Sequence, residues 1–301
     1  MNPLVSIITV TYNREKDIEL CLDSLLASSF SDYEAIVVDN ASTDKTRELL
    51  EEKYAGKIRL IKSETNLMAG GGRNLGAKYA TGDFLLFVDS DNVVDREMVE
   101  ELLHGFRNTK KAGLVGPLMY YYNDKGRIWW AGADINLLTS KTRYIGIDEI
   151  DEGQYQNIVE VGHIPNCFMT TRKIWEDVGG IESSFVMHYE ESDLAEKIKK
   201  AGWRAYLIPR AKTWHNIPSS FEKNIRNYGG ESHQRTYYTA KNRVLFMRRN
   251  TTRWKFLIFL LIFNNIFLVA YIVNLLKNKK YDLAKTYLKG SFDGAINRKE
   301  Q

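Results

Sequence analysis

The first hundred residues alternate between short apolar runs and longer segments whose apolar side chains recur at helical spacing. Val5–Thr11 is a continuous β-branched run, which is typical of a strand buried on both faces. Glu15–Ala27 follows, with Ile18, Cys21, Leu22, Leu25 and Leu26 at the spacing of a helix that buries one face. Further strands are predicted at 35–40, 58–62 and 84–88, with a helix at 45–54. This alternation predicts an α/β fold with a mostly parallel sheet and right-handed crossovers.

The strand in Phe84–Asp91, with the sequence FLLFVDSD, runs directly into two carboxylates. Asp89 and Asp91 are then expected at the carboxyl edge of the sheet, where open α/β sheets bind ligands. Asp39 ends an earlier strand, so three acids face the same edge. Two carboxylates one residue apart can share a hard divalent cation that phosphate oxygens also ligate. The alternative is a turn that caps a helix beginning near Asp95.

The segment 69–80, with the sequence AGGGRNLGAKYA, has three consecutive glycines before a predicted helix. Backbone N–H groups in such a loop can approach an anion at the helix N-terminus, which is a common way of holding phosphate. The alternative is a tight turn without a ligand. The segment enters between the acidic ends of two strands, and this convergence favours a nucleotide site.

The middle of the chain contains a second group of acids. Glu190, Glu191 and Asp193 stand at the start of a predicted helix, where acids also serve as ordinary partners of the helix dipole. A strand is predicted at Trp203–Ile208, and His215 follows it. An imidazole can complete a metal site begun by an aspartate, although a lone histidine is often structural.

Other segments of the middle region carry weaker signals. Residues 113–135 read as a strand, a turn at 123–126 and an aromatic strand, and residues 166–181 as a strand leading into a short helix. Trp129 and Trp130 offer faces for stacking on sugar rings, although at least one is expected in the core.

Phe256–Leu276 is uncharged for 21 residues, with only three asparagines among apolar side chains. About 20 such residues suffice to cross the hydrocarbon core of a bilayer. Basic residues flank both ends, so orientation cannot be read from charge, and a helix lying in or dipping into the inner leaflet is the second alternative. A buried core helix is the third alternative.

Charge and composition narrow the class of protein. The 301 residues contain 44% hydrophobic residues, which is enough for a substantial core, and the net charge is +4. Residues 241–301 alone carry a net +10 and the rest of the chain −6. A basic tail on an acidic body suits an anionic lipid surface, and we expect no nucleic-acid partner. Cys21 and Cys167 stand far apart, which excludes a disulfide framework and a zinc spacing. The N-terminus lacks the basic and apolar regions of a signal peptide, so the body is expected in the cytosol.

Four segments, in order and spacing, resemble a known family. VSIITVTYNREKDIELCLDSLL, IVVDNASTDKT, AGGGRNLGAKYATGD and FVDSD are similar to the nucleotide-sugar-binding half of inverting GT-A glycosyltransferases of family 2. The resemblance runs from about residue 4 to residue 250. Its nearest branch is the bacterial and archaeal one that includes rhamnosyltransferases acting on cell-surface glycans. It implies a Rossmann-like GT-A fold, with helices on both faces of the sheet, followed here by the C-terminal membrane-associated helix.

The resemblance also implies roles for individual residues. The nucleotide sugar is expected to contact Thr11 and Asn13, its pyrimidine Asp39 and Arg73, and its ribose and metal-bound diphosphate Asp89 and Asp91. The divalent cation, Mg²⁺ or Mn²⁺, is assigned to Asp89, Asp91 and His215. An aspartate carboxylate can accept from a base N–H, and the flat arginine fork can donate to base or phosphate.

The catalytic base follows from the same resemblance. Family members have a Glu-Asp pair in which the second acid deprotonates the acceptor hydroxyl, and this chain has Glu190 and Glu191 there. Glu191 is one methylene longer than the usual aspartate, so the assignment between Glu191 and Glu190 stays open. Residues 226–250 resemble the closing loop and helix of the family, in which Tyr238 and Arg243 brace the site.

These observations predict a metal-assisted inverting glycosyltransferase. It would move a sugar from a nucleoside-diphosphate sugar to a lipid-linked or cell-surface glycan acceptor at the cytoplasmic side of the cell membrane. We expect residues 1–110 to bind the donor, 111–250 to bind the acceptor and carry the base, and 251–301 to associate with the membrane. A catalytically inactive nucleotide-sugar sensor would lose the acids near residue 190. A sugar nucleotidyltransferase would need a Gly-rich, Arg-containing loop after the first strand, where this chain has TYNREKD.

Overall fold

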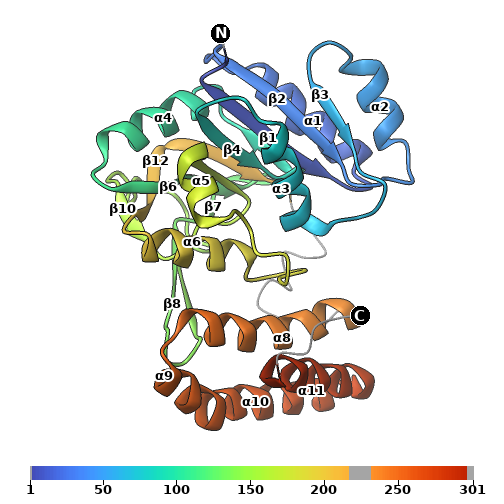
Figure 1. The fold of residues 1–301 in the computed structure, drawn as a ribbon, viewed down its shortest axis with the longest axis vertical. Helices are drawn as coiled ribbons and strands as arrows, with labels where there is room; N and C mark the ends of the chain where they lie inside the picture. Colours follow the sequence, from blue (N-terminus) through green and yellow to red (C-terminus); the bar gives the residue numbers. More distant parts are fainter. Residues whose placement is uncertain (1, 217–231, 297–301) are drawn as a thin grey trace. The chain divides into compact units, whose positions relative to one another are not determined.

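The computed structural model describes residues 2–216 and 232–296 (Figure 1). The chain divides into two compact units. The first contains Met1–Asp134, Tyr144–Glu182 and Leu194–Ile217, and the second contains Ile135–Arg143, Ser183–Asp193 and Pro218–Gln301. The predicted functional segments 1–110, 111–250 and 251–301 divide the chain differently and stay a prediction.

The first unit is built on a ten-stranded sheet whose main path has the order β10-β12-β6-β11-β4-β1-β2-β3. Its strands are β1 (Val5–Thr11), β2 (Tyr33–Asp39), β3 (Arg59–Lys62), β4 (Phe84–Val88), β5 (Asn92–Val94), β6 (Ala112–Tyr121), β7 (Asp124–Trp130), β10 (Val159–Val161), β11 (Cys167–Thr171) and β12 (Arg204–His215). A separate hairpin joins β8 (Gly132–Ile135) to β9 (Thr142–Ile145). The predicted strands at the start of the chain are confirmed.

The sheet is mostly parallel along its main path. β1 pairs in parallel with β2 and β4, β2 with β3, and β12 with β6. β11 is antiparallel to both β4 and β6, so β6 and β12 run in the same direction as β4. The carboxyl ends of β1, β2, β4 and β12 therefore meet at one edge, as predicted for the acids.

Helices cover both faces of this sheet. Successive side chains of a strand point to opposite faces, and β1 shows this directly. Ile8 faces Gly76 of α3 (Met68–Tyr79), whereas Thr9 faces Cys21 of α1 (Glu15–Leu26). The other helices of the first unit are α2 (Thr46–Lys53), α4 (Met98–Asn108) and α5 (Arg172–Val178), while α6 (Glu190–Lys200) begins in the second unit and continues into the first.

The glycine-rich segment differs from both predictions made for it. Residues 70–72 are neither a loop nor a tight turn, because α3 already begins at Met68, and the holding of phosphate at its N-terminus stays a prediction. A Cβ on Gly72 would lie 2.5 Å from Cγ1 of Val10, and one on Gly76 would lie 2.5 Å from Cγ2 of Ile8. Gly72 and Gly76 thus let α3 approach β1 closely. Glycine is needed at these two positions because it has no side chain, and not because the backbone adopts a conformation that only glycine allows.

We expect Gly76→Val to destabilise the fold by about 1–3 kcal/mol, as overpacking of a core does. The added side chain meets Ile8 and Val38 at the contact between α3 and the sheet. Urea unfolding measures the change. The matched control is Gly126→Ala, since a Cβ there meets nothing within 4 Å. Equal stability of the two variants would contradict this account of the helix–sheet contact.

The second unit contains the C-terminal helices α8 (His233–Asn250), α9 (Arg253–Ile258), α10 (Asn264–Lys277) and α11 (Tyr281–Ile296), with a π-helical turn η1 (Phe259–Phe263) between α9 and α10. α8 packs along α11, and α11 packs on α10. Arg253–Lys277 is a candidate membrane span, and its most apolar 18 residues have a mean hydropathy of 2.6 and are 11% buried. The alternative of a buried core helix is wrong, because most of the helix is exposed.

Candidate functional site

Arg73 and Asp89 form an ion pair at the carboxyl edge of the sheet. Arg73 projects from α3 and is only 2% exposed, and its Nη2 donates to Oδ1 of Asp89 at 2.5 Å. The guanidinium also lies 5.5 Å from the ring of Phe168. A buried guanidinium needs such a partner, because an unpaired buried charge is costly. The two residues predicted to contact the nucleotide are therefore brought together and hold one another.

Asp91 lies two residues further on and faces His215, which ends β12. Oδ1 of Asp91 lies 3.4 Å from Nε2 of His215, and Oδ2 lies 3.8 Å from Nη2 of Arg14. Burial alone would raise the pKa of Asp91, but the nearby His215 and Arg14 outweigh burial and lower it. The Asp91 side chain is therefore an anion at neutral pH. His215 is brought to it because the backbone N–H of Asn216 donates to the Asp91 carbonyl at 2.7 Å.

Asp91 and His215 fit a divalent cation. Oδ1 of Asp91 is buried and receives no hydrogen bond from the described residues, and carboxylate oxygen and imidazole nitrogen are ordinary ligands of Mn²⁺. Within residues 2–216 and 232–296, no three His, Cys, Asp or Glu side chains gather as a metal site. A cation here needs further ligands from elsewhere, as Mg²⁺ does when it binds one or two carboxylates and substrate phosphates. The role of Asp89 as a third ligand stays a prediction.

Two further side chains contact His215. Asn166 was not predicted from the sequence, and the sequence left the role of Trp129 open. Nδ2 of Asn166 lies 3.2 Å from Nε2 and 3.3 Å from Nδ1 of His215, and its backbone carbonyl accepts from the N–H of Asp89. The ring of Trp129 meets the imidazole edge to face, with centroids 4.5 Å apart. Trp130 is buried in the core, as expected of one of the two tryptophans. No local signal marks Asn166, because only the pairing of β4 with β11 brings it here.

Asp39 ends β2 and is fully buried. Its Oδ2 pairs with Nε of Arg47 at 2.5 Å, and its Oδ1 accepts from the N–H of Ser42 at 3.0 Å. The sequence did not single out Arg47, although it is the second residue of α2, the helix that follows. Arg47 holds the Asp39 carboxylate in place and partly neutralises its charge. A base N–H that approaches Asp39 therefore meets a carboxylate that is already paired with Arg47.

Thr11 and Asn13 lie where β1 ends, beside the end of β2. Oγ1 of Thr11 is buried and has no hydrogen-bond partner among the described residues. Asn13 has a left-handed backbone, with φ of 52°, and its Oδ1 accepts from the N–H of Thr43 at 2.7 Å. Asn13 thereby ties the two loops together. The structure places both predicted nucleotide contacts at the same edge as Asp39.

The acids near residue 190 begin α6 in the second unit. Glu190 is buried and Glu191 is half-buried, and the helix dipole favours both charges in the first turn. His188 and Tyr189, directly before them, have left-handed φ values of 66° and 68°. Such backbone costs about 1–3 kcal/mol per residue and persists only where the surroundings hold it.

Helix α8 holds this turn. Nδ2 of the buried Asn242 donates to the carbonyls of Met187 at 2.7 Å and of His188 at 3.3 Å. Asn250 donates to the buried Asp193 at 2.7 Å. Burial lowers the pKa of His188 to about 4, with a further lowering by the charge of Arg235 and an opposing effect of Glu191. The turn before the acids thus carries a neutral imidazole.

The side chains predicted to brace the site lie on α8. Tyr238 is buried, and Arg243 donates to Oδ1 of Asn264 at 3.0 Å and lies 4.7 Å from the ring of Phe267. Arg243 therefore braces α10 within the second unit. The predicted closing loop before α8 lies outside the described residues.

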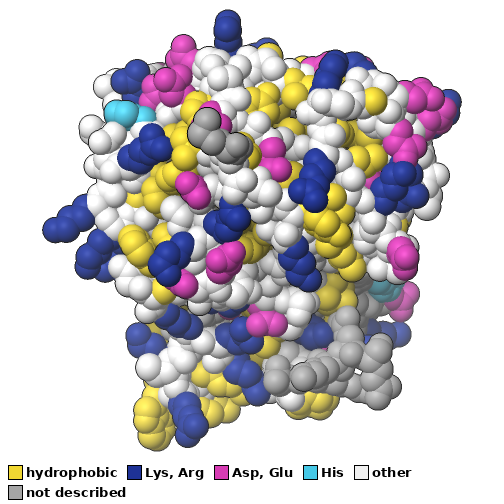
Figure 2. All heavy atoms as spheres, turned by 45° about the horizontal axis from the view of Figure 1, so that its top comes forward, with side chains coloured by type: hydrophobic (Ala, Val, Ile, Leu, Met, Phe, Trp, Pro, Cys, Tyr) yellow, Lys and Arg dark blue, Asp and Glu magenta, His cyan; other side chains and the backbone are white. Residues whose placement is uncertain are grey.

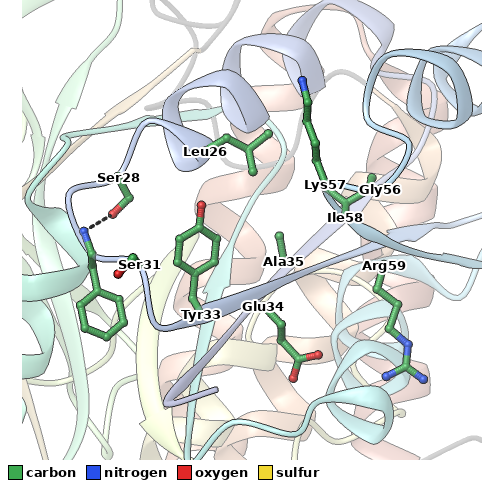
Figure 3. A pocket seen from close by; sticks show the side chains of 11 residues that line it. Leu26, Ser28, Ser31, Tyr33, Glu34, Ala35, Gly56, Lys57, Ile58 and Arg59 are labelled. Carbon is green, nitrogen blue, oxygen red and sulfur yellow. Dashed lines mark hydrogen bonds between the residues drawn. The ribbon is translucent and has the colours of Figure 1, made fainter. Parts of the chain in front are cut away.

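The pocket in Figure 3 is at the other end of the sheet. It has a volume of about 570 Å³ and is lined by residues that begin β2 and β3, including Glu34 and Arg59. Glu34 already accepts from the hydroxyls of Ser6 and Thr81. The amino ends of the strands meet here, so the pocket is distinct from the acidic edge and carries no candidate chemistry.

The fold and the acidic carboxyl edge define the GT-A class of glycosyltransferases. Residues 6–179 match the sequence profile described as "Glycosyl transferase family 2". The chain belongs to this family and is a glycosyltransferase that uses a nucleotide-sugar donor. An uncharacterized glycosyltransferase of Haemophilus influenzae is 38% identical over 248 residues, which cover 79% of this chain and 80% of that protein.

Two further similarities cover most of the chain. The N-acetylglucosaminyl-diphospho-decaprenol L-rhamnosyltransferase of Mycobacterium tuberculosis is 22% identical over 84% of this chain and 89% of its own length. The mannosyltransferase PcManGT of Pyrobaculum calidifontis, solved in complex with GDP-Man and Mn²⁺, has a TM-score of 0.59 at 16% identity and covers 99% of this chain and 89% of its own. Several other relatives match over shorter stretches, which are 18–44% of their length.

Proposed function

We propose that this enzyme transfers a sugar, with inversion, from a nucleoside-diphosphate sugar to a hydroxyl of a lipid-linked or cell-surface glycan acceptor. The observation that carries the donor half is the convergence of Asp39, Arg73, Asp89, Asp91 and His215 at one sheet edge in a family 2 chain. The name of the mycobacterial relative, a rhamnosyltransferase acting on a diphospho-decaprenol, supports the acceptor half.

In this proposal each residue either keeps its present contact or replaces that contact with one to the substrate. Asp39 accepts a hydrogen bond from an N–H of the base, while Arg47 partly neutralises the Asp39 carboxylate. Arg73 and Asp89 fix one another, and in this proposal the flat fork of the guanidinium donates to base or phosphate when the donor binds. Asp91 and His215 hold a divalent cation, which when bound neutralises the leaving diphosphate. The solved mannosyltransferase with Mn²⁺ supports the choice of cation.

The acceptor half of the reaction is assigned to the acids of α6. Glu191 is half-buried, and in this proposal it takes the proton of the acceptor hydroxyl. Glu190 is buried more deeply and is the second choice. Attachment of residues 251–301 to the cytoplasmic side of the cell membrane would bring this base to a lipid-linked acceptor.

The decisive experiment measures nucleoside diphosphate released from a panel of nucleotide sugars, with Mn²⁺ and with or without lipid-linked acceptors. The donor is chosen first by thermal stabilisation, since a ligand that binds only the folded state raises its stability. We expect release only when both donor and acceptor are present. A chain that binds the donor but releases no diphosphate with any acceptor would be a sensor, and the proposal would be wrong.

A further inference from the structure

An apolar stripe runs along one side of α10 and the preceding turn. Its members are Ile262, Ile266, Val269, Val273 and Leu276, which are 42–61% exposed. Their spacing of four, three, four and three residues is that of one helix face. Contiguous exposed apolar surface of this kind marks an interaction site.

The opposite side of α10 is fixed by polar contacts. Asn264 is buried, its Oδ1 accepts from Arg243 of α8, and its Nδ2 donates to Oγ of Ser291 in α11 at 3.1 Å. Further along, Leu275 packs with Ala284 and Tyr287 of α11. Helix α10 therefore has one defined side toward the protein and one toward its surroundings.

Helix α11 repeats the same division. Its side toward α8 is so close that a Cβ on Gly290 would lie 2.3 Å from the Tyr237 carbonyl oxygen. Its exposed side carries Leu288, Phe292 and Ile296, which are 45–62% exposed. The exposed Lys285 and Lys289 lie in the same helix.

Basic side chains border these stripes. Residues 251–281 contain five Lys or Arg and no Asp or Glu. Figure 2 shows apolar and basic side chains together over the part of the molecule where Figure 1 places α9 and α10. Apolar side chains bordered by Lys and Arg complement a bilayer that has anionic headgroups.

We propose that α9, α10 and α11 lie in the plane of an anionic membrane surface, with the exposed stripe of α10 in the headgroup–acyl boundary, and that α10 does not cross the bilayer. This inference rests on the proposed attachment to the membrane and names its geometry and its partner, an anionic lipid surface.

The contacts of α11 argue against a crossing helix. A 25-residue helix is about 37 Å long, enough to span a bilayer. However, α11 folds back along α10 after a turn of three residues, and a crossing would carry Lys285 and Lys289 with it into the hydrocarbon. Charged side chains are rare and costly there. An orientation in the plane lets both lysines reach the headgroups.

The first test is flotation of the full chain with vesicles of phosphatidylglycerol and phosphatidylcholine. We expect binding to the anionic vesicles and a loss of at least tenfold in Val269→Lys. The control is Ile150→Lys, which places the same charge at an exposed apolar residue of the first unit and should bind normally. A chain that forms stable dimers through this face and ignores the vesicles would overturn the proposal.

The second test distinguishes a helix α10 that lies in the membrane plane from one that crosses the bilayer. Nitroxide labels on single cysteines at Ile262, Val269 and Leu276 report depth, and the native Cys21 and Cys167 are buried and do not compete. A helix in the plane places all three labels at the same depth. A crossing helix would spread them over about 21 Å, at 1.5 Å per residue, and would overturn the proposal. Neither test uses a donor or acceptor, so failure here is distinguishable from failure of the proposed transfer reaction.

Discussion

Glu191→Gln is expected to lower the rate of sugar transfer by about 10²–10⁴-fold, the usual contribution of a general base. Glutamine fills the same volume but cannot take a proton from the acceptor hydroxyl. The variant should bind the donor as the unchanged enzyme does, because the nucleotide-binding residues are on other elements. Transfer rates and donor-induced thermal stabilisation, measured side by side, check both parts of this prediction.

Two matched variants on the same helix sharpen the result. Glu196→Gln alters an acid that pairs with Lys199 at 3.1 Å and has no assigned role, so its rate should be unchanged. Glu190→Gln decides the open assignment between neighbouring acids. If Glu190→Gln abolishes transfer while Glu191→Gln retains it, the base is Glu190. Full activity in both variants would remove the assigned mechanism.

The sheet edge could be predicted from the sequence because its signals are local. Buried β-branched runs such as Val5–Thr11 mark strands, and parallel strands bring their carboxyl ends to one edge. Asp39 and Asp89 stand directly after such runs, so their convergence follows from the chain order. The role of His215 came from the resemblance. The strand predicted at Trp203–Ile208 extends as β12 to His215 and runs parallel to β6, which brings His215 to the same edge.

The partners of these residues could not be predicted, because they depend on contacts between distant segments. Asn166 reaches His215 only through strand pairing across 49 positions. Asn242 supports the turn before Glu190 from 54 and 55 residues away. The glycines of α3 were misread for another reason. Glycine signals either backbone freedom or missing volume, and only the packing of Gly72 on Val10 shows which one applies.

The second large effect concerns Asp91, and the expected result is the loss of cation-dependent donor binding in Asp91→Asn. The substitution keeps the size of the side chain and removes the charge that faces His215. Stabilisation of a developing charge by a cation is worth several kcal/mol, so transfer should fall by at least about 100-fold. Addition of EDTA to the unchanged enzyme should reproduce this loss, and Mn²⁺ should reverse it.

Thermal unfolding with and without donor and Mn²⁺ separates this effect from simple damage to the fold. The unchanged enzyme should gain stability only when donor and Mn²⁺ are both present, because the cation has too few protein ligands to bind tightly alone. Asp91→Asn should melt normally and gain nothing. The control Asp83→Asn, an exposed acid just before β4, should behave like the unchanged enzyme. An EDTA-treated enzyme with full turnover would mean that Arg73 and other fixed charges neutralise the diphosphate without a metal, and the pairing of Asp91 with His215 would then be structural.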